Sequence, residues 1–110
     1  MCGRYGYDVP ELTASRFQAE LLPDVTPDIL VPRYNIAPTQ PVLAVATSKR
    51  LDGRRGVRSM VWGLTQQWAL NDGKKPRPIN LQAESLLERP TYSRLLAQKR
   101  CLIPASHFYE

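Results

Sequence analysis

The spacing of the prolines constrains this 110-residue chain more than any other feature. Ten prolines are spread along it, and five of them fall between Pro23 and Pro41. Proline fixes φ and has no backbone N–H, so this stretch can be neither a continuous helix nor a central strand. We therefore expect an ordered loop or a linker there, and many short elements rather than long helices in the rest of the chain.

Short elements are expected on both sides of this stretch. Leu and Phe recur at near-helical spacing over residues 10–22, which predicts a helix that the next proline ends. β-branched residues over 41–47 and the apolar run at 57–64 predict two strands. The charged connection between them carries Asp52-Gly53, a pair typical of a hairpin turn.

The C-terminal third of the chain alternates between helical and strand patterns. Two short helices are expected over 83–87 and 92–96, followed by a buried strand over 100–105 that breaks at Pro104. The whole pattern predicts one α+β domain over residues 1–110, a β-rich mixed or barrel-like sheet with short peripheral helices. Because the apolar residues after 107 end without a polar tail, we expect the chain to be the N-terminal portion of a larger domain.

Composition excludes several classes of protein. No apolar run approaches the roughly 18 residues of a membrane span, and the chain turns polar directly after its first residues, unlike a signal peptide. A cytoplasmic, nucleoid-associated protein is expected. Fifteen Lys and Arg against ten Asp and Glu give a net charge of +5, a mild preference for polyanions such as nucleic acids.

The few metal-ligating residues argue against a metal centre. Cys2 and Cys101 are the two cysteines, and His107 is the single histidine. These are too few and too widely spaced for a zinc site or a disulfide framework. We expect two free thiols and neither a metal nor an organic cofactor. Cys101 falls within the predicted strand, which favours a structural role for it.

Cys2 becomes reactive if Met1 is removed, and a residue as small as Cys at position 2 permits that removal. The new end carries an α-amine and a thiol, both partly deprotonated near neutral pH. The amine can condense with an aldehyde to a Schiff base, which the thiol closes to a five-membered thiazolidine. The alternative is a frayed end without function, since chain termini are often poorly ordered.

Five motifs occur in a fixed order along the whole chain. They are MCGRY at 1–5, RYNIAPTQ at 33–40, WGL at 62–64, NLQAES at 80–85 and RCLIPASHFYE at 100–110. In this order they resemble the SOS-response-associated peptidase (SRAP) family. That resemblance implies a protein that crosslinks covalently to abasic sites in single-stranded DNA and protects them during replication.

The resemblance also implies roles for individual residues. Cys2 matches the family's nucleophile, Asn80 the asparagine that holds the opened sugar, and Glu110 the acid/base group at the linkage. Arg4 matches a residue that grips phosphate. The segment that lines the family's cleft includes Asn35 and Pro38.

Three departures from the family pattern stand out. Gln82 occupies the position of a phosphate-binding arginine, which would weaken DNA binding. His107 replaces a small residue and is not the family's catalytic histidine, which lies further downstream; a surface, packing or proton-shuttle role is open. The tryptophan that follows the glutamate in the family is absent after Glu110.

Further DNA contacts are suggested by aromatic and basic residues. Trp68 could stack on a base or pack in the core, and Lys75 and Arg77, just before the Asn80 motif, could face DNA. For Trp62, inside an apolar strand, a core position is favoured. The basic hairpin residues could form a phosphate track or a solvated turn; they are Arg54, Arg55 and Arg58.

We therefore expect an abasic-site sensor that forms a thiazolidine crosslink through Cys2, with single-stranded DNA as its partner. It would act as a monomer unless a separate C-terminal half of the same domain binds to it. The covalent crosslinking of DNA would be a lyase-like activity. A thiol peptidase or autopeptidase that uses Cys2, and so a hydrolase and protease, is one alternative. A non-covalent single-stranded DNA-binding module is the other.

Overall fold

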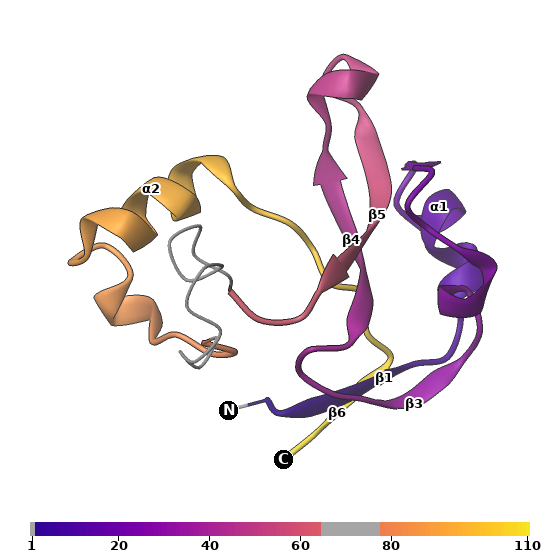
Figure 1. The fold of residues 1–110 in the computed structure, drawn as a ribbon, viewed down its shortest axis with the longest axis horizontal. Coiled ribbons are helices and arrows are strands. Elements are labelled where there is room, and N and C mark those ends of the chain that lie inside the picture. Colours follow the sequence, from indigo (N-terminus) through magenta and orange to yellow (C-terminus); the bar gives the residue numbers. More distant parts are fainter. Residues whose placement is uncertain (1, 65–77) are drawn as a thin grey trace.

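Two three-stranded sheets form the framework of the computed structural model, which describes residues 2–64 and 78–110. The first sheet is antiparallel, in the order β3 (Arg33–Ile36), β1 (Arg4–Tyr7) and β6 (His107–Tyr109). The second is mixed, in the order β2 (Glu20–Leu21), β5 (Arg55–Val61) and β4 (Pro41–Thr47), with β2 parallel to β5. Figure 1 shows the β4–β5 hairpin standing between the helices α1 and α2.

The helices between and beside these strands are short. The two α-helices are α1 (Thr13–Arg16) and α2 (Pro90–Gln98). The 3-10 helices are η1 (Pro10–Leu12), η2 (Pro27–Ile29), η3 (Lys49–Leu51) and η5 (Ala83–Ser85). The predicted α+β class with short helices is confirmed. None of the helices in the described part of the chain combines the length and the apolar character that a membrane crossing needs.

The predicted N-terminal helix is shorter than expected. η1 and α1 end at Arg16, and Gln18 then takes a left-handed conformation with φ 49°. Beyond this break the chain is extended in β2, and Leu22 N–H donates to the carbonyl of Val57 at 3.0 Å. The near-helical spacing of the later leucines was misleading, because those leucines pack beside β5 rather than on a helix. Tertiary pairing overrides local spacing here.

The proline-rich stretch, expected to be an ordered loop or a linker, is ordered but is not a loop throughout. It contains η2 and the strand β3, which lies at the edge of its sheet, where missing N–H groups are tolerated. The hairpin prediction is confirmed as well. Asp52 and Gly53 have φ of 51° and 80°, and Gly53 N–H closes the turn onto the carbonyl of Ser48 at 2.9 Å.

The hydrophobic core contains side chains from both sheets. Its buried side chains come from β1, β3, β4, β5 and η2: Tyr5, Tyr7, Ile29, Ile36, Val42, Leu43, Val45 and Val57. The alternation along β1 and β3 sends Tyr5 and Ile36, which are paired across the strands, into this core. The polar residues of the same strands remain outside it.

The prediction of a buried strand at 100–105 was wrong. This segment makes one isolated bridge, between Val45 and Leu102, and Leu102 is 60% exposed. Pro104 is the buried residue of the segment, whereas Cys101 is exposed. The two short helices expected before this segment are present as η5 and α2, but α2 is longer than predicted because Pro90 lies in its first turn.

Candidate functional site

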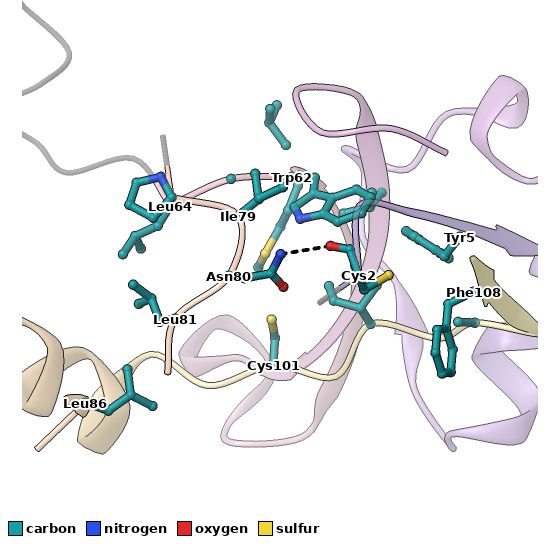
Figure 2. Close-up of a pocket in the computed structure, with 17 residues that line it drawn as sticks. Cys2, Tyr5, Trp62, Leu64, Ile79, Asn80, Leu81, Leu86, Cys101 and Phe108 are labelled. Carbon is teal, nitrogen blue, oxygen red and sulfur yellow. Dashed lines mark hydrogen bonds between the residues drawn. The ribbon is translucent and has the colours of Figure 1, made fainter. Parts of the chain in front are cut away.

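Cys2 lies at the wall of a pocket of about 740 Å³, which we call the Cys2 pocket. Its walls come from β1, β4, β5, β6 and the segments at 78–81 and 101–105 (Figure 2). Most of the lining side chains are apolar or aromatic, among them Tyr5, Trp62, Leu64, Ile79, Leu81, Leu86, Ile103 and Phe108. Few of the lining residues have polar side chains; among them are Asn80, Cys2 and Cys101. A pocket of this size falls in the range that holds small organic ligands.

A hydrogen bond joins two of the predicted site residues, Cys2 and Asn80. The side-chain amide of Asn80 donates from Nδ2 to the carbonyl oxygen of Cys2 at 2.9 Å (Figure 2). The Cys2 thiol donates weakly to the carbonyl of Arg4, with 3.4 Å between sulfur and oxygen. Asn80 is itself placed by the chain before it, because Leu64 N–H donates to the carbonyl of Pro78 at 2.9 Å. Although Cys2 is only the second residue of the chain, these hydrogen bonds hold its backbone at the pocket.

Trp62 forms part of the pocket wall and also packs against the core. Its ring meets the ring of Tyr5 edge-on, with 5.5 Å between centroids. Burial raises the pKa of the Tyr5 hydroxyl to about 12. The nearby Arg33 lowers this pKa by a smaller amount, and Cys2 adds to the increase. Trp62 therefore packs partly against the core, as expected, and partly lines the Cys2 pocket.

The predicted DNA contacts Arg4 and Asn35 are brought together across β1 and β3. The guanidinium of Arg4 donates from Nη1 to Oδ1 of Asn35 at 3.0 Å, and both residues are exposed. Pro38 is half-buried in the turn that follows β3. The side chain of Gln40 stabilises that turn, since its Oε1 accepts from the N–H of Ala37 at 3.0 Å. Arg4 and Asn35 are 31 residues apart in the sequence, and the pairing of β1 with β3 brings them together.

Glu110 follows β6 directly and is exposed. The residue before it, Tyr109, pairs with Arg4 across the sheet and donates from its hydroxyl to the carbonyl of Tyr34 at 2.7 Å. These contacts hold the end of β6 beside the start of β1, near Cys2. Glu110 is not among the residues that line the Cys2 pocket, so its predicted acid/base role stays a prediction.

His107 packs over Gly6, its partner across the strands. Its Nε2 lies 3.1 Å from the hydroxyl of Tyr109, and its Nδ1 lies 3.7 Å from Oδ1 of Asp8. A Cβ at Gly6 would overlap the imidazole, so the absence of a side chain at Gly6 makes room for His107. The contacts favour the packing role for this histidine among the three that were open.

Cys101 was not recognised as a pocket residue from the sequence. It lines the Cys2 pocket beside Asn80, and partial burial raises the pKa of its thiol (Figure 2). No local signal marks this position, because the segment has a strand-like composition without pairing as one. The predicted purely structural role for Cys101 therefore does not fit its exposed position.

The hairpin arginines have protein partners. Arg54 pairs with Glu20, Arg58 lies 3.4 Å from Oδ2 of Asp24, and Arg55 donates to the carbonyl of Phe17 at 3.0 Å. These contacts favour a structural role over a phosphate track. Gln82 is exposed and directly precedes η5, and its backbone carbonyl accepts from the N–H and the hydroxyl of Ser85, the last residue of that helix.

Three predicted DNA contacts, Trp68, Lys75 and Arg77, lie outside the described residues. Within the described ranges 2–64 and 78–110, no three His, Cys, Asp or Glu side chains gather closely enough to hold a metal ion. The site as described therefore combines an N-terminal thiol, an amide and apolar walls.

Comparison with known proteins agrees with the order of the motifs. The family model for SOS response associated peptidase (SRAP) matches residues 1–110. Two curated relatives from Bacillus subtilis (strain 168) are the abasic site processing proteins YoaM, 40% identical over 80 residues, and YoqW, 39% identical over 80 residues. In each case the match covers 72% of this chain and 34% of the relative, so the chain spans about a third of the length of these proteins.

The fold is shared with a protein of known crystal structure. That protein, from Bordetella bronchiseptica, is 21% identical and superposes with a TM-score of 0.66. The alignment covers 99% of this chain and 50% of the other. At this identity the likeness concerns the fold.

Proposed function

The chain belongs to the SRAP family, and we propose that it processes abasic sites in DNA by forming a covalent crosslink through Cys2. The observation that carries this proposal is the position of Cys2 at the wall of a pocket, where Asn80 binds its carbonyl oxygen. The curated relatives are named abasic site processing proteins, which supports the same kind of lesion as the target.

The chemistry begins after Met1 is removed. The free α-amine of Cys2 attacks the C1′ aldehyde of the ring-opened sugar, and loss of one water gives a Schiff base. The thiol then adds to the imine carbon, its proton passes to the nitrogen, and a thiazolidine ring results. One aldehyde and one aminothiol thus give one ring and one water, and no oxidant or metal takes part.

Two neighbours would assist these steps. The Asn80 amide, already 2.9 Å from the Cys2 carbonyl, fixes the nucleophile and could turn to a sugar oxygen. Glu110, at the end of β6, would move protons on and off the sugar and the departing water. A carboxylate can do so when it is within hydrogen-bond reach of the reacting atoms.

The DNA strand would lie along the exposed polar edge of β1 and β3. Arg4 and Asn35 offer a guanidinium and an amide there, suited to phosphate and sugar oxygens. Only single-stranded or flipped-out nucleotides can enter a pocket of this kind, which favours single-stranded DNA as the partner. The protein would act as a monomer in the nucleoid, with Trp68, Lys75 and Arg77 as further contacts.

A second candidate follows from the word peptidase in the family's name. Cys2 would then be an N-terminal nucleophile that cleaves peptides or releases its own Met1, the autoproteolytic and hydrolase alternative. A lyase-like outcome, with strand cleavage after Schiff-base formation, uses the same amine. A non-covalent DNA-binding module would need neither group.

A denaturing gel separates these candidates. The protein is incubated with an abasic single-stranded oligonucleotide and with a labelled peptide, and intact mass spectrometry reports the state of Met1. The proposal requires a stable adduct, lost in Cys2→Ala and in protein that retains Met1, and no peptide turnover. An adduct that survives either change would show that the crosslink does not use the aminothiol of Cys2.

A further inference from the structure

The walls of the Cys2 pocket are more apolar than an abasic sugar requires. A ring-opened deoxyribose presents hydroxyl groups and two phosphates, whereas the pocket offers mainly the side chains of Trp62, Ile79, Leu86 and Ile103. Several of its apolar residues are partly exposed, including Ile79 at 40% and Ile103 at 44%. Apolar surface that is open to water in a pocket can bind a ligand by the hydrophobic effect.

The chemistry of the pocket restricts which apolar ligand is retained. An N-terminal aminothiol reacts with aldehydes in general, since ring closure needs the carbonyl carbon and nothing else of the molecule. A volume of about 740 Å³ leaves room beside Cys2 for an alkyl chain. Figure 2 shows Leu64, Leu81 and Leu86 toward one end of the pocket, its leucine side, and Cys2 toward the other end, with Asn80 between them.

We infer that the Cys2 pocket is also a capture site for small apolar aldehydes, of the alkanal class, which it holds as thiazolidines. The carbonyl carbon bonds to the nitrogen and the sulfur of Cys2, the carbonyl oxygen leaves as water, and the alkyl chain lies against the leucine side of the pocket. This inference rests on the free α-amine of the proposed function. It adds a second substrate class, and it makes such aldehydes competitors of abasic DNA.

A homologous series of aldehydes tests the inference in the protein from which Met1 has been removed. Propanal, pentanal, heptanal and nonanal are titrated against the protein, and intact mass spectrometry measures the adduct, which has the mass of the aldehyde less one water. Each methylene that enters the pocket should lower the half-saturating concentration by a factor of about two to four. A peptide of sequence CGRYG has the same reactive end without a pocket, so its half-saturating concentration should stay constant along the series.

Two adjacent leucines provide a matched pair of variants. Leu86 lines the pocket, whereas Leu87 is 74% exposed and does not. Leu86→Asn should reduce the dependence on chain length, and Leu87→Asn should leave it as in the wild type. Ile103→Asn, in another wall, gives the same test should Leu86→Asn fail to fold, as judged by its thermal melt.

The outcomes separate this inference from the proposed function. Abasic DNA that crosslinks normally, together with a chain-length dependence no steeper than that of the peptide, overturns the inference alone. A protein that reacts with neither DNA nor any aldehyde, although Met1 is absent, overturns both. A steep dependence in the protein, reduced only by the pocket variants, and inhibition of DNA crosslinking by nonanal more than by propanal, support the inference.

Discussion

Replacing Gly6 with alanine should destabilise the protein, because the new methyl group would occupy the space of the His107 ring. A Cβ at Gly6 would overlap Nε2 and Cε1 of the imidazole and lie 3.2 Å from the carbonyl of Arg33. The ring is not free to move away at no cost. Its Nε2 lies 3.1 Å from the hydroxyl of Tyr109, and the two rings meet edge-on with 5.3 Å between centroids.

The size of the effect follows from what the displaced ring would lose. The hydrogen bond to Tyr109 contributes about 1 kcal/mol, and the edge-on ring contact about 0.5–1 kcal/mol at this partly exposed position. Alanine restricts the unfolded chain more than glycine does, which stabilises the folded state by about 0.4–1 kcal/mol. The free energy of unfolding should therefore fall by about 1 kcal/mol in Gly6→Ala.

A double-mutant cycle with His107→Ala checks the reasoning by urea denaturation. Without the imidazole, the methyl group meets open space, so Gly6→Ala should be neutral or stabilise by up to about 1 kcal/mol in that background. The coupling between the two changes should then be about 2 kcal/mol. An equal loss of stability in both backgrounds would refute the argument, because it would place the clash at the carbonyl of Arg33 instead.

Three further outcomes are expected. Asn80→Asp removes the amide donor to the Cys2 carbonyl, so the rate of crosslinking on a denaturing gel should fall about tenfold, while Leu87→Asn leaves it unchanged. Arg4→Ala should reduce the slope of log affinity against log salt for single-stranded DNA by about 0.7, whereas Arg58→Ala, which breaks a half-exposed pair with Asp24, should leave that slope as it is. Burial raises the pKa of Tyr5 to about 12, so its hydroxyl stays neutral in the folded protein, whereas in the unfolded chain it ionises above pH 10. The free energy of unfolding should therefore fall as the pH rises from 10 to 12. In urea titrations at alkaline pH, Tyr5→Phe should lose that dependence.

The elements that the sequence predicted correctly depend on local chemistry. The β4–β5 hairpin follows from β-branched runs and from Asp52-Gly53, whose backbone angles only such residues adopt readily. The strand β3 was not predicted, although the prolines around it agree with its place at the edge of the sheet. The lengths of these runs alone were enough to predict the α+β class.

The errors share a different origin, in contacts between distant residues. The leucines after Arg16 follow a helical spacing, and only the pairing of β2 with β5 makes them extended. For Arg54 and Arg58 the sequence left a phosphate track and a solvated turn open, and it did not predict their carboxylate partners, which lie 34 residues away in the sequence. Cys101 reached the pocket in the same way, since its place depends on one bridge, from Leu102 to Val45.

The candidate site could be anticipated only where the family resemblance supplied it. Cys2 and Asn80 are separated by 78 residues, and nothing in the composition of either segment predicts their hydrogen bond. The apolar walls were missed for a related reason. Ile103 was predicted in a buried strand, whereas it is 44% exposed and lines the pocket, as does Phe108, for which no position had been predicted.

The register between β1 and β6 determines which of their side chains face the Cys2 pocket and which face the opposite side of the sheet. Tyr5 faces Phe108 on the side of the Cys2 pocket, while Arg4 with Tyr109, and Gly6 with His107, lie on the other side. Because side chains alternate along a strand, a slip of β6 by one residue against β1 would send His107 and Tyr109 toward the pocket and Phe108 away from it. The fit of His107 over Gly6 opposes such a slip, since only glycine leaves room for the ring. This pair therefore keeps Phe108 at the wall of the Cys2 pocket and His107 on the opposite face of the sheet, although neither Gly6 nor His107 lines the pocket.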